Sequence, residues 1–180
     1  MNSYRSPITI LKEYSTKKKI IAVLGVLAAE GLVYFKHGLS YNMLFLSIYS
    51  VLMFCMSIED LDHGSVDYKY EISLLLLSAG YFYIQTEYHS KLMLTGFVIS
   101  IIFMLIILSI EYFSKRYILG GADIVLFTIL GLMIGVYKFF AFIFGVLILM
   151  ELLKRTKLLS RIKQGYPMIP AIYIISLFFI

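Results

Sequence analysis

Two aspartates, Asp60 and Asp123, lie where acid–base chemistry could be done at the edge of an apolar segment. Asp60 closes one apolar run, and Asp123 opens another directly after Gly120-Gly121-Ala122. If two carboxyl groups meet, their like charges cannot both persist, so we expect the pair to share one proton. The ionised member can then take a proton from water while the protonated member polarises a carbonyl group. This chemistry hydrolyses a peptide bond without metal, nucleophile or cofactor, and the sequence leaves open which aspartate is the acid.

The composition indicates that lipid is the solvent. Hydrophobic residues make up 61% of the 180 residues and charged residues 15%, whereas an average soluble domain is about 45–50% apolar and about 25% charged. Only helices and closed barrels span a bilayer, because an unpaired backbone group in hydrocarbon costs several kcal/mol. The apolar runs are continuous rather than alternating, which favours helices. We therefore predict an all-α, polytopic membrane bundle.

Seven apolar segments predict about seven (six to seven) transmembrane helices. Several of them are shorter than the ~20 residues that a full crossing prefers. The weakest boundary is at Val136-Tyr137-Lys138, and one tilted helix over 122–153 would reverse the sidedness of everything after it. The predicted crossings lie near residues 20–35, 41–58, 71–87, 92–113, 122–136, 138–153 and 166–179.

The basic residues predict the orientation. Of the sixteen Lys and Arg residues, all but Lys36, Lys91 and Lys138 fall on the same side as the N-terminus, which the positive-inside rule makes cytoplasmic. Both aspartates then reach the cytoplasmic face of the plasma membrane. The net charge of +5 is explained by orientation and by contact with anionic lipid, so no nucleic-acid partner is expected. We predict a cytoplasmic segment over 1–19 and a single transmembrane domain over 20–180.

An acidic cluster surrounds the first aspartate. Residues 59–71 hold five carboxylates and one histidine, and for Asp62, Asp67 and Glu71 a solvated loop is the ordinary interpretation. Asp60 differs because apolar residues flank it and an apolar helix precedes it. The glycines before Asp123 allow a tight turn or a close approach of another segment. An acid in the first turn of a helix also interacts favourably with the helix dipole, which is the non-catalytic interpretation of that residue.

Three other interpretations remain open. A carboxylate-based cation or proton transporter would use buried acids, and Glu30 lies within the first predicted crossing. A metal site could use Glu59 and His63, which are four residues apart, but the histidines are scattered and we expect none. A non-catalytic membrane assembly protein has no distinguishing motif. Cys55 is the only cysteine, which excludes an internal disulfide.

Around the two aspartates the chain resembles the type IV prepilin peptidases, the GxGD group of intramembrane aspartic proteases. Gly120-Gly121-Ala122-Asp123 is similar to their Gly-x-Gly-Asp motif, with alanine at the third position. Residues 60–67 are similar to their Asp-Leu-x-x-x-x-Ile-Pro pattern, with Val66 for the aliphatic residue and Asp67 in place of proline. Val125 stands where many members have lysine. Residues 166–171 resemble the proline-containing entry into the family's last helix, so that the resemblance covers about 41–180.

This resemblance implies an endopeptidase that removes the leader from prepilin-like precursors at the cytoplasmic membrane face, with Asp60 and Asp123 as catalytic residues and no cofactor. Larger members also methylate the new N-terminus through an insert that often carries paired cysteine motifs. This chain has neither, so we expect peptidase activity alone. Because prepilin leaders are typically basic, Glu59, Asp62 and Asp67 are candidate leader-binding residues. The substrate and the oligomeric state are not indicated by the sequence.

Overall fold

The computed structural model describes residues 7, 12, 16–115, 119–155 and 167–180, and over these ranges the regular structure is entirely helical. The prediction of an all-α fold is thereby confirmed, and each predicted crossing overlaps mainly with one helix, although 71–87 and 122–136 extend by one residue into the next helix. Most of the predicted cytoplasmic segment 1–19 lies outside the described residues. The helices are α2 (Thr16–His37), α3 (Tyr41–His63), α4 (Tyr68–Tyr83), α5 (Glu87–Ser114), α6 (Gly121–Ile134), α7 (Val136–Arg155) and α8 (Ile169–Phe179).

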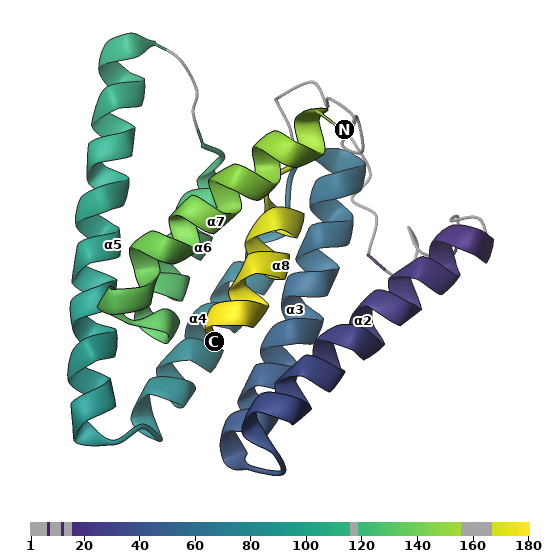
Figure 1. Cartoon of the computed structure of the whole chain (residues 1–180). Coiled ribbons are helices and arrows are strands. Elements are labelled where there is room, and N and C mark those ends of the chain that lie inside the picture. Colours follow the sequence, from purple (N-terminus) through teal and green to yellow (C-terminus); the bar gives the residue numbers. More distant parts are fainter. Residues whose placement is uncertain (1–6, 8–11, 13–15, 116–118, 156–166) are drawn as a thin grey trace.

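The helices run alternately up and down through the bundle (Figure 1). Helix α3 packs against α2, α4 and α8, while α6 packs against α4, α5 and α7. Helix α8 also touches α6 and packs on α7. Helices α4 and α8 therefore connect the part of the bundle that holds α3 to the part that holds α6.

Three helices are long and apolar enough to cross a membrane by length and composition. They are the segments Tyr41–Asp62, His89–Ser114 and Val136–Arg155, with mean hydropathy of 1.7, 2.7 and 2.1. Helices α6 and α8 are apolar but shorter, at 14 and 11 residues. At 1.5 Å per residue α6 is about 21 Å long, less than the ~30 Å of a hydrocarbon core. The chain is built as a membrane helical bundle, and the number of full crossings stays a prediction.

The weakest predicted boundary is a true break between two helices. Helix α6 ends at Ile134 and α7 begins at Val136, separated by Gly135 with φ 76° and ψ 169°. A positive φ of this size is accessible to glycine at little cost, and the N–H of Gly135 still donates to the carbonyl of Gly131. A single tilted helix over 122–153 is therefore excluded, so α6 and α7 run as the prediction of seven segments requires.

Helices α5 and α6 pack with almost no side chain between them. A Cβ added to Gly96 would lie 2.3 Å from the carbonyl oxygen of Gly131, and one added to Gly131 would lie 2.4 Å from Oγ of Ser100. The Ser100 hydroxyl donates across the interface to the carbonyl of Thr128 at 3.3 Å. Small residues of this kind allow membrane helices to approach closely. This contact fixes the position of α6, which carries Asp123 in its first turn, along the length of α5.

Two buried hydrogen bonds fix the register of α8 against α3. The Tyr49 hydroxyl donates to Oγ of Ser176 at 2.6 Å, and the hydroxyls of Ser50 and Tyr173 are 2.7 Å apart. The four side chains are all buried, so each polar group in this apolar interface is paired. Because α8 runs antiparallel to α3, the same register brings the N-terminus of α8 to the C-terminal end of α3.

Two lysines hold the other end of α8. The Lys36 ammonium donates to the carbonyls of Leu177 and Phe178, both at 2.9 Å, and the Lys138 ammonium donates to that of Phe179 at 3.3 Å. Cations at a helix C-terminus satisfy the last carbonyls and interact favourably with the dipole. Two of the three basic residues assigned to the non-cytoplasmic side therefore have a packing role there.

Candidate active site

Asp60 lies in the last turn of α3 and is 7% exposed. The helix continues past the predicted end at residue 58 and stops at His63, where Gly64 (φ 65°) donates its N–H to the carbonyl of Asp60 at 2.9 Å. Oδ2 of Asp60 accepts a hydrogen bond from the backbone N–H of Ile169 at 2.9 Å, and the N–H of Met168 also donates to this carboxyl group. The side chain is thereby held in one orientation at the start of α8.

The two amides that bind Asp60 are residues that the sequence analysis missed. The first N–H groups of a helix have no partner inside it, and together with the dipole they form a site for a carboxylate. Pro167 and Pro170 flank these amides and have no N–H of their own. Met168 and Ile169 are therefore the N–H donors between the two prolines. The Pro-x-x-Pro spacing is the sequence feature that could have indicated them. The predicted proline-containing entry into the last helix is confirmed from Pro167 onward, while Tyr166 lies outside the described residues.

Asp123 occupies the first turn of α6 and is partly buried. Its Oδ2 accepts a hydrogen bond from the N–H of Gly120 at 3.0 Å, which is one half of a capping box. A Cβ added to Gly120 would lie 3.1 Å from that oxygen, so glycine allows the carboxylate to approach its own loop closely. A Cβ added to Gly121 would meet open space, and Ala122 packs against the core.

The two aspartates lie within electrostatic range of one another. Asp60 at the end of α3 is close enough to Asp123 at the start of α6 for the two charges to interact. The helices that carry them are held by α4 and α8 rather than by an extensive contact of their own. Each carboxylate is anchored through one oxygen to backbone N–H groups. The arrangement offers two oriented acids from separate helices at one end of the bundle.

The three candidate leader-binding acids differ in exposure. Glu59 is fully buried, and its Oε2 accepts the N–H of Asp67 at 3.1 Å, so it closes the loop between α3 and α4. Asp67 is the N-cap of α4, because its Oδ1 accepts the N–H of Lys69 at 3.1 Å. Asp62 is exposed. Of the three, Asp62 is the most exposed to solvent.

Other polar groups give no second site in the described part of the chain. No group of three or more His, Cys, Asp or Glu residues there could hold a metal ion. Cys55 is partly buried in α3. Glu30 is partly buried in α2, with Oε1 shielded from solvent and without a hydrogen-bond partner among the described residues.

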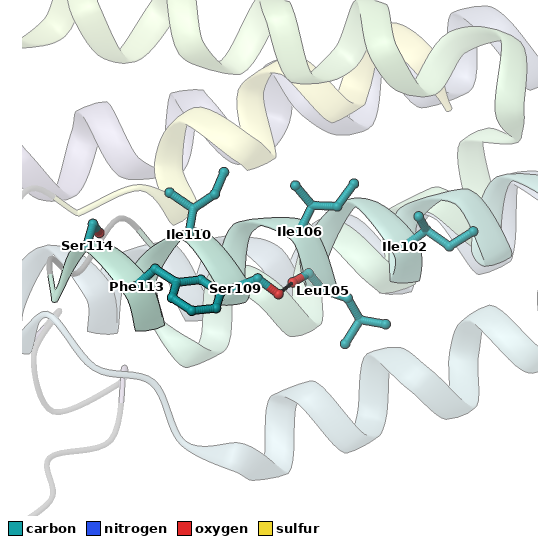
Figure 2. A pocket seen from close by; sticks show the side chains of 7 residues that line it. All are labelled: Ile102, Leu105, Ile106, Ser109, Ile110, Phe113 and Ser114. Carbon is teal, nitrogen blue, oxygen red and sulfur yellow. Dashed lines mark hydrogen bonds between the residues drawn. The ribbon is translucent and has the colours of Figure 1, made fainter.

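A shallow hollow of about 650 Å³ lies on α5, and Figure 2 shows its lining from Ile102 to Ser114. Neither aspartate lines it, and Ile102, Ile106 and Ile110 are 47–52% exposed. The Ser109 hydroxyl donates to the carbonyl of Leu105 at 2.8 Å, so the polar group on this face is satisfied within its own helix. Such a face is suited to lipid rather than to acid–base chemistry.

A sequence model of the type IV leader peptidase family matches residues 47–153. The matched range runs from α3 to α7 and includes both aspartates and the glycines before Asp123. Comparison with curated proteins and with solved structures gives no match. Helix α8, whose N-terminus binds Asp60, lies outside the matched range.

Proposed function

The chain belongs to the type IV leader peptidase family, and we propose that it is an aspartic endopeptidase that removes leaders from prepilin-like precursors at the cytoplasmic membrane face. The observation that carries this proposal is the convergence of Asp60 and Asp123, from two helices, within electrostatic reach of one another. Family membership supplies the general reaction, a peptidase. The two carboxylates supply the general acid and the general base of the proposed reaction.

The proposed reaction uses the aspartates as a coupled pair that shares one proton. The ionised member removes a proton from water, and the resulting hydroxide attacks the scissile carbonyl carbon. The protonated member donates its hydrogen bond to the carbonyl oxygen and later returns a proton to the leaving amine. Anchoring by Ile169 and Gly120 holds each side chain in place before the substrate arrives, which lowers the entropy cost of the reaction.

Three features support the proposed face and substrate. The end of the bundle that carries Asp60 also carries the basic C-terminal end of α7, with Lys154 and Arg155, which the positive-inside rule places in the cytoplasm. The exposed apolar helices suit a membrane-embedded precursor. Asp62 offers a negative charge to a basic leader close to the reacting pair.

The test is co-expression of the full chain with a prepilin-like precursor, scoring the loss of the leader as a size shift. We expect the wild type to cleave and Asp60→Ala and Asp123→Ala to leave the precursor intact. Glu151→Ala is the matched control, because Glu151 is an exposed acid paired with Arg155 at 3.1 Å on the same end of α7. All variants must accumulate in the membrane at the level of the wild type. Cleavage that survives both aspartate substitutions would refute the proposal.

A cation or proton transporter is the second candidate, and the unpaired buried oxygen of Glu30 is the observation that favours it. Ion flux into vesicles that contain the purified chain separates the two functions. Transport predicts a flux that Glu30→Gln abolishes, whereas the peptidase proposal predicts no flux and normal cleavage by the same variant.

A further inference from the structure

Glu111 binds the loop that carries the second aspartate. It lies in the last turn of α5, is partly buried, and its Oε1 accepts the backbone N–H of Leu119 at 2.7 Å. Leu119 packs its side chain against the core. A charged acceptor at this distance makes one of the stronger kinds of hydrogen bond in proteins. The bond ties the chain that enters α6 to the end of the preceding helix.

The next N–H along the chain belongs to the site itself. The N–H of Gly120 donates to Oδ2 of Asp123 at 3.0 Å, so two successive amides are held by two carboxylates. The two N–H groups lie on either side of the Cα of Leu119, in adjacent peptide units, so a shift of Leu119 also moves Gly120. The orientation of the Asp123 carboxylate therefore depends on where Glu111 holds Leu119.

Apart from the packing of Leu119, Ala122 and Ile124 against the core, few described contacts hold this end of α6. Gly120 is the N-cap residue and has no side chain to bind the first turn. The tight contact between α5 and α6 is centred on Gly131, eight residues and about 12 Å further along the helix. Helix α5 ends at Ser114, and its C-cap Lys115 has a left-handed φ of 52°. Glu111 is thus the side chain that binds the backbone next to Gly120, the partner of Asp123.

We propose that Glu111 is a positioning residue, which holds Asp123 in its reactive orientation through the backbone of Leu119 and Gly120. This inference rests on the proposed peptidase function. Its essential feature is the acceptor oxygen and not the negative charge. A glutamine oxygen can accept the same N–H, whereas alanine cannot.

The kinetic test uses the full chain purified in detergent and a synthetic precursor with a basic leader and an apolar helix. Glu111→Ala should lower kcat by about tenfold to a hundredfold with KM unchanged. A shift of the Asp123 carboxylate by about 1 Å slows the chemical step but leaves the binding of the substrate unchanged. Glu111→Gln should restore kcat close to the wild type, and Glu151→Ala should match the wild type. A glutamine variant as slow as the alanine variant would overturn the proposal in favour of a role for the charge. A raised KM at unchanged kcat in Glu111→Ala would overturn it in favour of a role in substrate binding.

Amide hydrogen exchange tests the anchor independently of activity. In Glu111→Ala the peptide that contains Leu119 and Gly120 should exchange about tenfold faster than in the wild type, the effect expected from losing one hydrogen bond. Glu111→Gln and Glu151→Ala should exchange as the wild type does. Equal exchange in all four proteins would overturn the proposal. If the wild type cleaves no precursor, the proposed function fails, and the exchange rates still decide whether Glu111 holds the loop.

Discussion

The backbone N–H of Ile169 donates a 2.9 Å hydrogen bond to Oδ2 of Asp60, a residue 109 positions earlier in the chain. The last helix therefore takes part in the site, although the family match ends at residue 153. Asp60 depends on the start of α8 for its orientation in the same way that Asp123 depends on Gly120. Oδ2 of each acid accepts a backbone N–H at the start of a helix, and in the proposed reaction the other oxygen would face the substrate.

Asp60→Asn should abolish cleavage and keep the fold. The amide oxygen of asparagine can still accept the N–H groups of Ile169 and Met168, but the side chain can no longer exchange a proton with water. Asp60→Leu should abolish cleavage and also lower stability by about 1–3 kcal/mol, because two amides lose their acceptor. Thermal unfolding in detergent and precursor cleavage measure the two effects. Activity in the asparagine variant would show that Asp60 is structural only.

Charge at Asp62 should affect the binding of the leader more than the chemical step. Asp62 is exposed in the last turn of α3, and exposed ion pairs contribute about 0–1 kcal/mol. Asp62→Lys should therefore raise KM for a basic leader by no more than about fivefold, with kcat little changed. The difference from wild type should shrink at high salt, where exposed charges are screened.

Asp67→Asn separates the charge of the neighbouring acid from its capping role, because asparagine is an equally good N-cap for α4. A precursor with a neutral leader is the control and should show no change in KM for either variant. If both variants bind the basic leader as the wild type does at low salt, leader recognition by these acids is ruled out.

The sequence predicted the helices well because lipid demands continuous apolar runs. Each of the seven segments corresponds to a helix, and even the weak boundary at Val136 is a break, set by the positive φ of Gly135. The helix ends were less predictable. Helix α3 runs through the charged Glu59-Asp60 to His63, since polar residues in a last turn do not stop a helix that Gly64 then closes. Helix α5 begins at Glu87, before the apolar run from 92 that predicted it.

The site was predictable only in its side chains. Asp60 and Asp123 are distinguished by apolar flanks and by glycines, which the sequence displays directly. The flanking prolines indicate where the amides of Met168 and Ile169 lie, but every residue other than proline has an N–H, and only the fold brings these two to Asp60. The exposure of Glu59 was equally hidden. Whether an acid faces solvent or closes a loop depends on the path of the backbone after the helix, here the return of Asp67 to Glu59.

Lys36→Met should destabilise the fold without affecting catalysis. Its ammonium donates to two carbonyls in the last turn of α8 at 2.9 Å, at the end of the bundle opposite to Asp60. Removing a cation from a helix C-terminus costs about 0.3–1 kcal/mol at an exposed position. Lys138→Met removes one longer bond of 3.3 Å and should cost less. Melting temperatures should fall in that order, with kcat equal to that of the wild type. A lower kcat in Lys36→Met would mean that α8 transmits changes along its length to the site.

Gly96→Ala should force α5 and α6 apart. The added methyl group would lie 2.3 Å from the carbonyl oxygen of Gly131 and 2.8 Å from the backbone of Gly135, and no flexible side chain can move aside. Overpacking of this kind costs about 1–3 kcal/mol. Because α6 carries Asp123, the shift should also lower kcat. Thermal unfolding and precursor cleavage, measured on the same preparation, check both parts.

Gly31→Ala is the matched control, because Gly31 is also within a helix and an added Cβ there meets nothing within 4 Å. Alanine in a helix interior is favoured over glycine by about 1 kcal/mol, so this variant should be as stable as the wild type or more so. Opposite signs for the two substitutions would identify close packing as the cause, since helix propensity alone predicts that both stabilise. If Gly96→Ala melts no lower than Gly31→Ala, the two helices can separate at no cost, and their contact does not set the position of Asp123.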